Sequence, residues 1–347
     1  MGPRPSAAGR GNGDEMATET MTGEDEAAAG ASGPGTGAGE TRHVLMMAYG
    51  GPDKIEDVPD YLRDVRNYRP TSEALIHEIA ERYAEIGGRS PILELTTAQA
   101  EALEAALNEN ADGPRWRVHV AMRHWHPFIK DVLAGLEGEG VSRVVGLVMA
   151  PHYSRMSIGA YYKRLGEASS PIEVVQIERW HLLPGYLDAL ADRVRVALEE
   201  KFPAEVRSEV PVIFSAHSLP EKIQEWDDPY PRELRETVAA IAERIAPHPY
   251  TFSYQSAAMT PDPWLGPDVA EVVEGYAAQG KRHVLVAPIG FVTEHVEILY
   301  DIDVDFMRRA TAIGVHLERI EMLNAHPLMI GALADLVKAR SAQHAPA

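Results

Sequence analysis

The sequence predicts an α/β fold built from two similar halves, each an open parallel sheet covered by helices. From residue 42 onward, short and nearly continuous apolar runs alternate with amphipathic segments of helical length. Strands that are almost entirely apolar and are separated by helices are typical of parallel sheets with both faces covered. About four such runs precede residue 180 and four follow it. We therefore expect two halves with a cleft between them.

The individual elements follow in chain order. The apolar runs predict strands at His43–Tyr49, Trp116–Met122, Val144–Ala150, Ile172–Ile177, Val210–Ser215, Tyr250–Tyr254, His283–Ala287 and Val315–Ile320. The amphipathic segments predict helices, for example at Thr97–Asn108, Pro184–Glu200, Pro231–Ile245, Asp268–Gln279, Glu294–Arg309 and Pro327–Arg340. No internal repeat is strong enough in the sequence to prove duplication.

The chain divides into four regions. Its 347 residues suffice for two domains or one large α/β unit. Residues 1–40 hold 10 of the 28 glycines and lack large apolar residues other than methionine, so we expect a disordered acidic tail. Residues 41–175 and 176–325 should form the two halves. Residues 326–347 should form a helix that packs back on the body.

Composition excludes several classes of protein. A net charge of −19 argues against non-specific nucleic-acid binding. Because the chain has no cysteine, it can form no disulfide, Cys-held iron–sulfur cluster or thiol nucleophile. No apolar stretch approaches the roughly 20 residues of a membrane helix, and the tail resembles neither a secretory signal nor a transit peptide. We expect a soluble, cytoplasmic protein without membrane insertion.

Two familiar active-site motifs are also disfavoured. The segment Gly275–Lys281 imitates a phosphate loop, but Arg282 replaces its Ser or Thr and the segment precedes a strand instead of following one. The segment Ser215–Ser218 lacks the flanking glycines of a nucleophile elbow, which disfavours a serine hydrolase.

Polar side chains stand where the predicted strands end, and ligands of open α/β sheets bind at the carboxyl ends of strands. They are Tyr49, Arg123, His124, His152, His217, Gln255 and the stretch 290–297. Ser218 and Glu221 form a capping-box pattern, which predicts a helix directly after His217. His217 would then face the cleft from a rigid junction, although a histidine that is merely hydrogen-bonded in a loop is the alternative.

Three acids recur along the segment that follows Thr293, a plausible N-cap. Glu297, Asp301 and Asp305 stand at i, i+4 and i+8, so a regular helix would place them on one face. A solvated acidic face is the usual explanation for such a pattern. A hydrated dication site or a relay is the alternative, because apolar residues between the acids imply a packed helix.

A local reversal of charge occurs between residues 63 and 89. Five arginines accompany two tyrosines and Ser90 in an otherwise acidic chain; the arginines are Arg63, Arg66, Arg69, Arg82 and Arg89. They could pair with nearby glutamates on the surface. They could also bind a flat aromatic ligand that carries several carboxylates, since arginine presents a planar fork to carboxylates.

Taken together, these segments resemble the ferrochelatases, which insert ferrous iron into a porphyrin in haem biosynthesis. The matching stretches run in the family's order over most of the folded part. They are Ala48–Pro52, Arg82–Ile92, Ala150–Ser154, Phe214–Pro220, Asp228–Tyr230, Tyr254–Ser256, Pro263–Pro267 and Pro288–Tyr300. The resemblance implies a Rossmann-like, chelatase-type fold with the active cleft between its halves.

The resemblance also implies roles for single residues. His217 matches the family's active-site histidine, which takes pyrrole protons or handles the metal, and Glu297 matches the acid that faces it. Asp301 and Asp305 would continue as a metal or proton relay. Tyr49 resembles the tyrosine on the opposite porphyrin face. The positions that match the porphyrin site and its propionate contacts are Arg66, Arg82, Tyr83, Ser90 and Tyr161.

Two branches of the family exist, and Tyr49 together with the lack of an apolar lip around residues 66–79 resembles the soluble branch, which uses coproporphyrin III. Its substrate carries four propionates instead of two, which suits an arginine-rich site. We expect no cofactor beyond the substrate Fe²⁺, a monomer, and at most transient contact with neighbouring haem-pathway enzymes. Neutral His217 would accept a proton near pH 7.

Three alternatives stay open. A protoporphyrin IX ferrochelatase would keep the reaction and change the substrate. A non-catalytic tetrapyrrole carrier would use the same Arg and Tyr residues without needing a base opposite an acid. A cobalt or nickel chelatase on the same fold is disfavoured by the match around His217 and Glu297.

Overall fold

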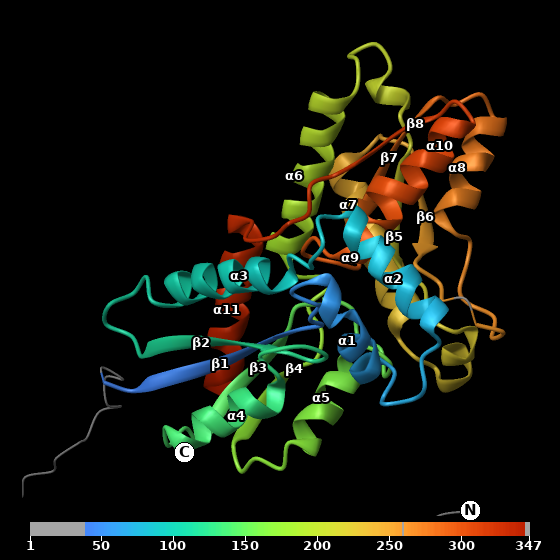
Figure 1. Ribbon diagram of the computed structural model, residues 1–347. Helices are drawn as coiled ribbons and strands as arrows, with labels where there is room; N and C mark the ends of the chain where they lie inside the picture. Colours follow the sequence, from blue (N-terminus) through green and yellow to red (C-terminus); the bar gives the residue numbers. More distant parts are fainter. Residues whose placement is uncertain (1–38, 259, 344–347) are drawn as a thin grey trace, which may run out of the picture. The chain divides into compact units, whose positions relative to one another are not determined.

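The computed structural model describes residues 39–343 apart from residue 259 (Figure 1). Most of the predicted tail at 1–40, and the last four residues of the predicted region 326–347, lie outside the described residues.

Two parallel four-stranded sheets organise the described chain. The first contains β1 (Thr41–Ala48), β2 (Arg115–Met122), β3 (Arg143–Val148) and β4 (Glu173–Ile177), in the order β2-β1-β3-β4. The second contains β5 (Val212–His217), β6 (Tyr250–Gln255), β7 (His283–Pro288) and β8 (His316–Arg319), in the order β6-β5-β7-β8. The equivalent orders confirm the prediction of two similar α/β halves.

Helices surround both sheets, as the alternating sequence pattern predicts. The first half contributes η1 (Ile55–Asp57), α1 (Val58–Val65), α2 (Glu73–Glu85), α3 (Ile92–Leu107), α4 (Ile129–Gly138) and α5 (Ile158–Glu167). After β4 come α6 (Pro184–Lys201), η2 (Arg207–Glu209), η3 (Glu221–Trp226), α7 (Tyr230–Ile245), α8 (Val269–Ala278), α9 (Val296–Leu299), η4 (Asp301–Phe306), α10 (Met307–Ala312) and α11 (Pro327–Gln343). None of these described helices is both long and apolar enough to span a bilayer.

One hydrophobic core joins the two halves. It contains Val44 and Leu147 from the first sheet together with Phe214 and Leu285 from the second, all fully buried. Helices α6 and α11 contribute to this same core, and α11 packs against α6, α3, β3 and β4 (Figure 1). In the described residues, the terminal helix α11 thus packs on the first sheet and on α3 and α6.

The segment from Glu294 to Arg309 is not the regular helix that the sequence predicts. It is divided into α9, the π-helix η4 and α10. The widened turn is visible in the backbone, because the amide of Asp305 donates to the carbonyl of Tyr300 at 2.9 Å, five residues back. Thr293 does not cap it: the N-cap residue is His295, without a side-chain cap. π-Helical turns are rare and occur often at functional sites.

The predicted capping box after His217 is also wrong. Ser218 donates its hydroxyl to the carbonyl of Leu265 at 2.7 Å, and η3 begins only at Glu221 after Pro220. The Ser218 hydroxyl therefore binds a chain segment 47 residues further on and does not cap the helix start. A true capping box stands at α8, where Asp268 and Glu271 satisfy each other's backbone amides.

Candidate active site

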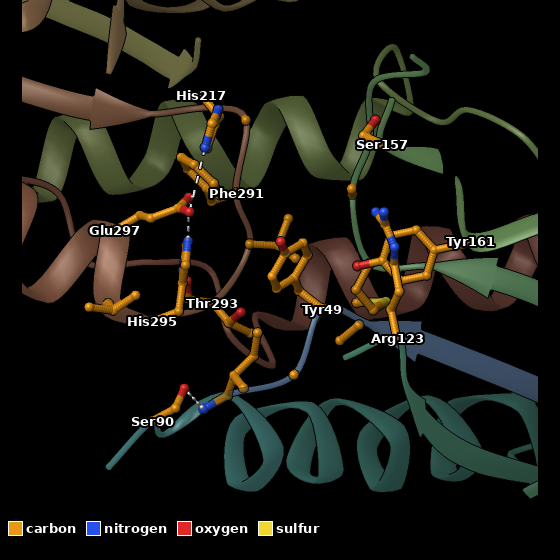
Figure 2. Close-up of a pocket in the computed structure, with 18 of the residues that line it drawn as sticks. Tyr49, Ser90, Arg123, Ser157, Tyr161, His217, Phe291, Thr293, His295 and Glu297 are labelled. Atoms are coloured by element: carbon orange, nitrogen blue, oxygen red, sulfur yellow. Dashed lines mark hydrogen bonds and ion pairs between the residues drawn. The ribbon is translucent and has the colours of Figure 1, made fainter. Parts of the chain in front are cut away.

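A cavity of about 270 Å³ lies between the two halves, at the carboxyl ends of their strands (Figure 2). Residues after β1, β2 and β3 line one side, and residues at the ends of β5 and β7 line the other. This is where open α/β sheets place their ligands. The turn after β1 depends on Gly50, whose φ of +91° and close approach to the Trp125 amide leave no room for a side chain.

Three side chains form a line along one wall of the cavity (Figure 2). Nε2 of His217 lies 3.5 Å from Oε1 of Glu297, and Oε2 of Glu297 lies 3.5 Å from Nε2 of His295. The other nitrogen of each ring is fixed by a backbone carbonyl, that of Ser218 for His217 and that of Thr293 for His295. The rings of both histidines are therefore oriented toward the one carboxylate.

The charges of this pair follow from its surroundings. Burial alone would lower the pKa of His217, but the Glu297 carboxylate and the Ser218 carbonyl outweigh it and raise the pKa to about 9. Burial alone would raise the pKa of Glu297, but His217 and His295 outweigh it and hold the pKa below its ordinary range. With this pKa, His217 is an imidazolium at neutral pH, and it must lose this proton before it can accept another.

Asp301 lies behind Glu297 and does not line the cavity. Its Oδ2 accepts the Ser256 hydroxyl at 2.5 Å, and its Oδ1 lies 3.6 Å from Nη1 of Arg82. Burial raises the pKa of Asp301 to about 6, with the neighbouring Glu297 charge adding to the effect. Asp305 lies further out, 39% exposed and 3.9 Å from Arg309. Of the three acids spaced four residues apart, the structure therefore places Glu297 in the cavity lining and leaves Asp301 and Asp305 behind it.

The facing wall combines aromatic rings with a half-buried cation, Arg123 (Figure 2). The Arg123 guanidinium lies 5.7 Å from the Tyr49 ring centre and 5.3 Å from that of Tyr161. Its buried Nε has no hydrogen-bond partner among the described residues. Burial raises the pKa of the Tyr49 hydroxyl to about 12, so it stays protonated. This wall offers flat apolar surface and one cation for an anionic ligand.

The predicted porphyrin residues separate into two groups. Tyr49, Tyr83, Ser90 and Tyr161 line the cavity. Arg66 and Arg82 do not: Arg66 donates to the Pro70 carbonyl, and Arg82 pairs with Glu78 at 2.8 Å and lies over the Tyr300 ring. The alternative of pairing with nearby glutamates thus holds for Arg82, which also contacts Asp301.

Four lining residues were not assigned a catalytic or porphyrin-binding role by the sequence argument: Arg123, Phe291, Thr293 and His295. A signal did exist, since Arg123 and the stretch 290–297 directly follow predicted strands. The charge reversal at 63–89 drew attention away from Arg123, because a lone arginine after β2 does not form a cluster in sequence. His295 is two residues from Glu297, a spacing that a regular helix places on different faces.

Comparison with known proteins gives the family. The ferrochelatase family model matches residues 41–341. The chain belongs to the ferrochelatase family. A ferrochelatase of Herpetosiphon aurantiacus is 41% identical over 299 residues, covering 85% of this chain and 97% of the relative. A coproporphyrin III ferrochelatase of Geobacillus kaustophilus is 38% identical over 308 residues, covering 88% of this chain and 97% of the relative.

The fold has a similar solved structure as well. SirB from Bacillus subtilis with Fe³⁺ matches with a TM-score of 0.51 and 10% identity, covering 88% of this chain and 96% of that one. This likeness confirms a chelatase-type fold. As a ferrochelatase, the chain inserts a metal ion into a porphyrin, and His217 and Glu297 line the cavity between its halves.

Proposed function

We propose that this ferrochelatase inserts Fe²⁺ into coproporphyrin III, with His217 and Glu297 as the residues that handle metal and protons. The observation that carries the proposal is the placement of the His217–Glu297 pair opposite the wall of Tyr49, Arg123 and Tyr161. A flat macrocycle between these walls would have one face toward the acid and base and the other toward Tyr49.

The charge state of the pair suggests how metal entry and proton loss are coupled. His217 begins as an imidazolium because Glu297 is ionised beside it. A dication that approaches Glu297 competes with that proton electrostatically, which lowers the pKa of His217 and releases the proton. His217 is then a neutral imidazole next to the macrocycle and can accept a pyrrole proton. Two pyrrole protons leave as one Fe²⁺ enters, so the charge balances; His217 takes them one after the other and releases the first to solvent in the cavity before it accepts the second.

Asp301 and Asp305 are proposed as the outer relay for metal or protons. Exposure rises along the series, from 12% for the Asp301 side chain to 39% for that of Asp305. With a pKa near 6, Asp301 can change its protonation state close to neutral pH. A group of that kind behind Glu297 suits the transfer of protons away from the cavity.

The choice of coproporphyrin III rests on charge and on relatives. The Geobacillus kaustophilus relative is named for this substrate, as are further relatives at 37–38% identity. Arg123 lines the cavity, and Arg66 has a buried Nε without a hydrogen-bond partner in the described chain. Four propionates need more such donors than two. We propose that Arg66, Arg82 and Arg123 bind propionates, with Tyr83, Ser90 and Tyr161 against the ring.

Anaerobic insertion kinetics test the proposal. Fe²⁺ is mixed with coproporphyrin III or protoporphyrin IX, and the visible spectrum reports the metal complex. We expect faster conversion of coproporphyrin III, and a loss of about 10²–10⁴-fold in His217→Ala with porphyrin binding retained. His283→Ala, at the amino end of β7 and away from the cavity, is the matched control. Preference for protoporphyrin IX would overturn the substrate, and binding without turnover would leave a carrier.

A further inference from the structure

The segment that carries the acids is poorly stabilised by its own backbone. Helix α9 has only four residues and continues into the π-helix η4. Short helices are marginal in isolation, and like charges four residues apart destabilise them further. Five carboxylates fall between residues 294 and 305 without a lysine or arginine among them. Core packing of Ile298, Ile302 and Phe306 holds the apolar face of the segment, but its acids find no lysine or arginine partner within residues 294–305.

Arg319, the last residue of β8, supplies a basic partner from outside the segment. Its Nε and Nη2 bind the two carboxylate oxygens of Asp303 at 2.7 and 2.8 Å, a bidentate fork. Its Nη1 donates to the carbonyl of Ile320 at 2.9 Å and lies 3.7 Å from Oε1 of Glu294. The Arg319 side chain is only 12% exposed. Bidentate and buried contacts of this kind fix geometry as well as charge.

The two acids that Arg319 contacts flank the ones that face the site. Glu294 precedes Glu297 by three residues, and Asp303 follows Asp301 by two. One guanidinium thus ties both ends of the segment to the edge of the second sheet. Neither Arg319 nor Asp303 lines the cavity, so their contacts act on the site only through the backbone of 294–303.

We propose that Arg319 is a positioning residue for metal insertion, which holds residues 294–303 so that Glu297 stays against His217. The proposal rests on the proposed function, since it names metal handling by Glu297 as the step that is served. Small errors in the placement of a reacting group are costly: a displacement of about 1 Å can lower a rate by about 10²-fold.

Kinetics of Arg319→Met, Arg319→Lys and Asp303→Asn test it. We expect Arg319→Met to lower kcat at least about tenfold and to raise the KM for Fe²⁺, with the porphyrin Kd from fluorescence quenching within about twofold of the unaltered protein. Arg319→Lys should recover part of the loss, because lysine keeps the charge without the fork. The control is Arg244→Met, which removes a 2.7 Å ion pair to Asp188 outside the cavity lining.

Two results of these kinetics would overturn the proposal. A folded Arg319→Met with unchanged kcat and KM for Fe²⁺ would overturn the proposal, as would an equal loss in Arg244→Met. If Arg319→Met does not fold, Asp303→Asn decides, because it keeps the shape of the side chain and removes its charge. Normal kinetics in that variant would also overturn the proposal.

Hydrogen exchange gives a readout that does not depend on turnover. In Arg319→Met the amides of residues 296–306 should exchange at least about tenfold faster, while those of α8 should be unchanged. Unchanged exchange in 296–306 would count against positioning. If the unaltered protein inserts iron into neither porphyrin, the proposed function fails while this measurement still decides the role of Arg319.

Discussion

His217 and Glu297 face each other across 3.5 Å, from the end of β5 and from the short helix α9. Each side chain keeps about three-tenths of its surface exposed, 30% for His217 and 31% for Glu297. The pair is therefore accessible from the cavity and still shielded enough that each charge sets the ionisation of the other. At neutral pH the two side chains form an ion pair, His217 as the imidazolium and Glu297 as the carboxylate.

The first prediction concerns the titration of this pair. Glu297→Gln removes the charge that raises the pKa of His217 to about 9. Burial is then the dominant influence, so we expect the pKa to fall below the ordinary value of about 6.5. NMR titration of ¹³C-labelled histidine rings measures it, and His77, an exposed histidine on α2, serves as an internal control. An unchanged His217 pKa in Glu297→Gln would refute the electrostatic coupling.

The same coupling makes the stability contribution of the pair depend on pH. Because the folded pKa of His217 is raised, its contribution is complete below about pH 6.5 and is lost as the pH rises through about 9. Because the folded pKa of Glu297 is lowered, its contribution is present above about pH 4.5 and is lost in acid. Urea unfolding should therefore show the destabilisation by His217→Ala shrinking between pH 6 and 10.

The second prediction concerns Asp301, whose pKa is raised to about 6. Its folded state holds a proton more tightly than the unfolded chain, so its contribution to stability is present below about pH 3.8 and is lost as the pH rises through 6. Relative to the unaltered protein, Asp301→Asn should therefore gain stability between pH 4 and pH 8, by up to about 3 kcal/mol. Urea unfolding at both pH values measures this gain. Asp60→Asn, at an exposed carboxylate outside the site, is the control.

The pattern of residues predicted the architecture well because the buried strands are continuous runs of apolar residues. Runs such as Val44–Met47 have no polar residue, and only a sheet covered on both faces accommodates them. The local helix signals failed where a distant segment competed for a side chain. Ser218 donates to the Leu265 carbonyl instead of capping a helix, and the acidic segment, whose Asp303 binds Arg319, contains the π-helix η4 in place of a regular helix. Contacts across 47 and 16 positions leave no periodic signal in one sequence.

The candidate site was also predictable only in part. His217 ends β5 and Tyr49 directly follows β1, so the topology alone places them at the cleft. The sequence could not show that Arg123 lines the cavity and Arg82 does not. Arg82 belongs to α2, and this helix contacts the second half through the Arg82–Asp301 and Glu85–Arg308 pairs. The charge of His217 could not be predicted from sequence either, because it depends on the distance to Glu297, 80 residues later.

The third prediction assigns porphyrin affinity to Arg123. Its guanidinium lies against Tyr49 and Tyr161 and lines the cavity. We expect Arg123→Leu to weaken coproporphyrin III binding about 10- to 100-fold, since a charged contact in a partly buried site contributes about 1.5–3 kcal/mol. Fluorescence quenching measures the Kd. Arg89→Leu, which removes an exposed arginine paired with Glu94, should change it less than about twofold; equal effects of the two variants would contradict the assignment.

The fourth prediction ranks the three acids by their distance from the reaction. Glu297 lines the cavity, Asp301 lies behind it at 12% exposure, and Asp305 is 39% exposed next to Arg309. Replacing each by its amide should therefore lower kcat for iron insertion in the order Glu297→Gln, Asp301→Asn, Asp305→Asn. We expect a loss of about 10²–10⁴-fold for the first, and a smaller loss for each acid further out. Because a relay carries protons in series, kcat for Asp305→Asn should recover with higher buffer concentration, which supplies another proton acceptor. A loss at Asp305 as large as that at Glu297, without recovery by buffer, would show that the outer acid acts on the metal itself.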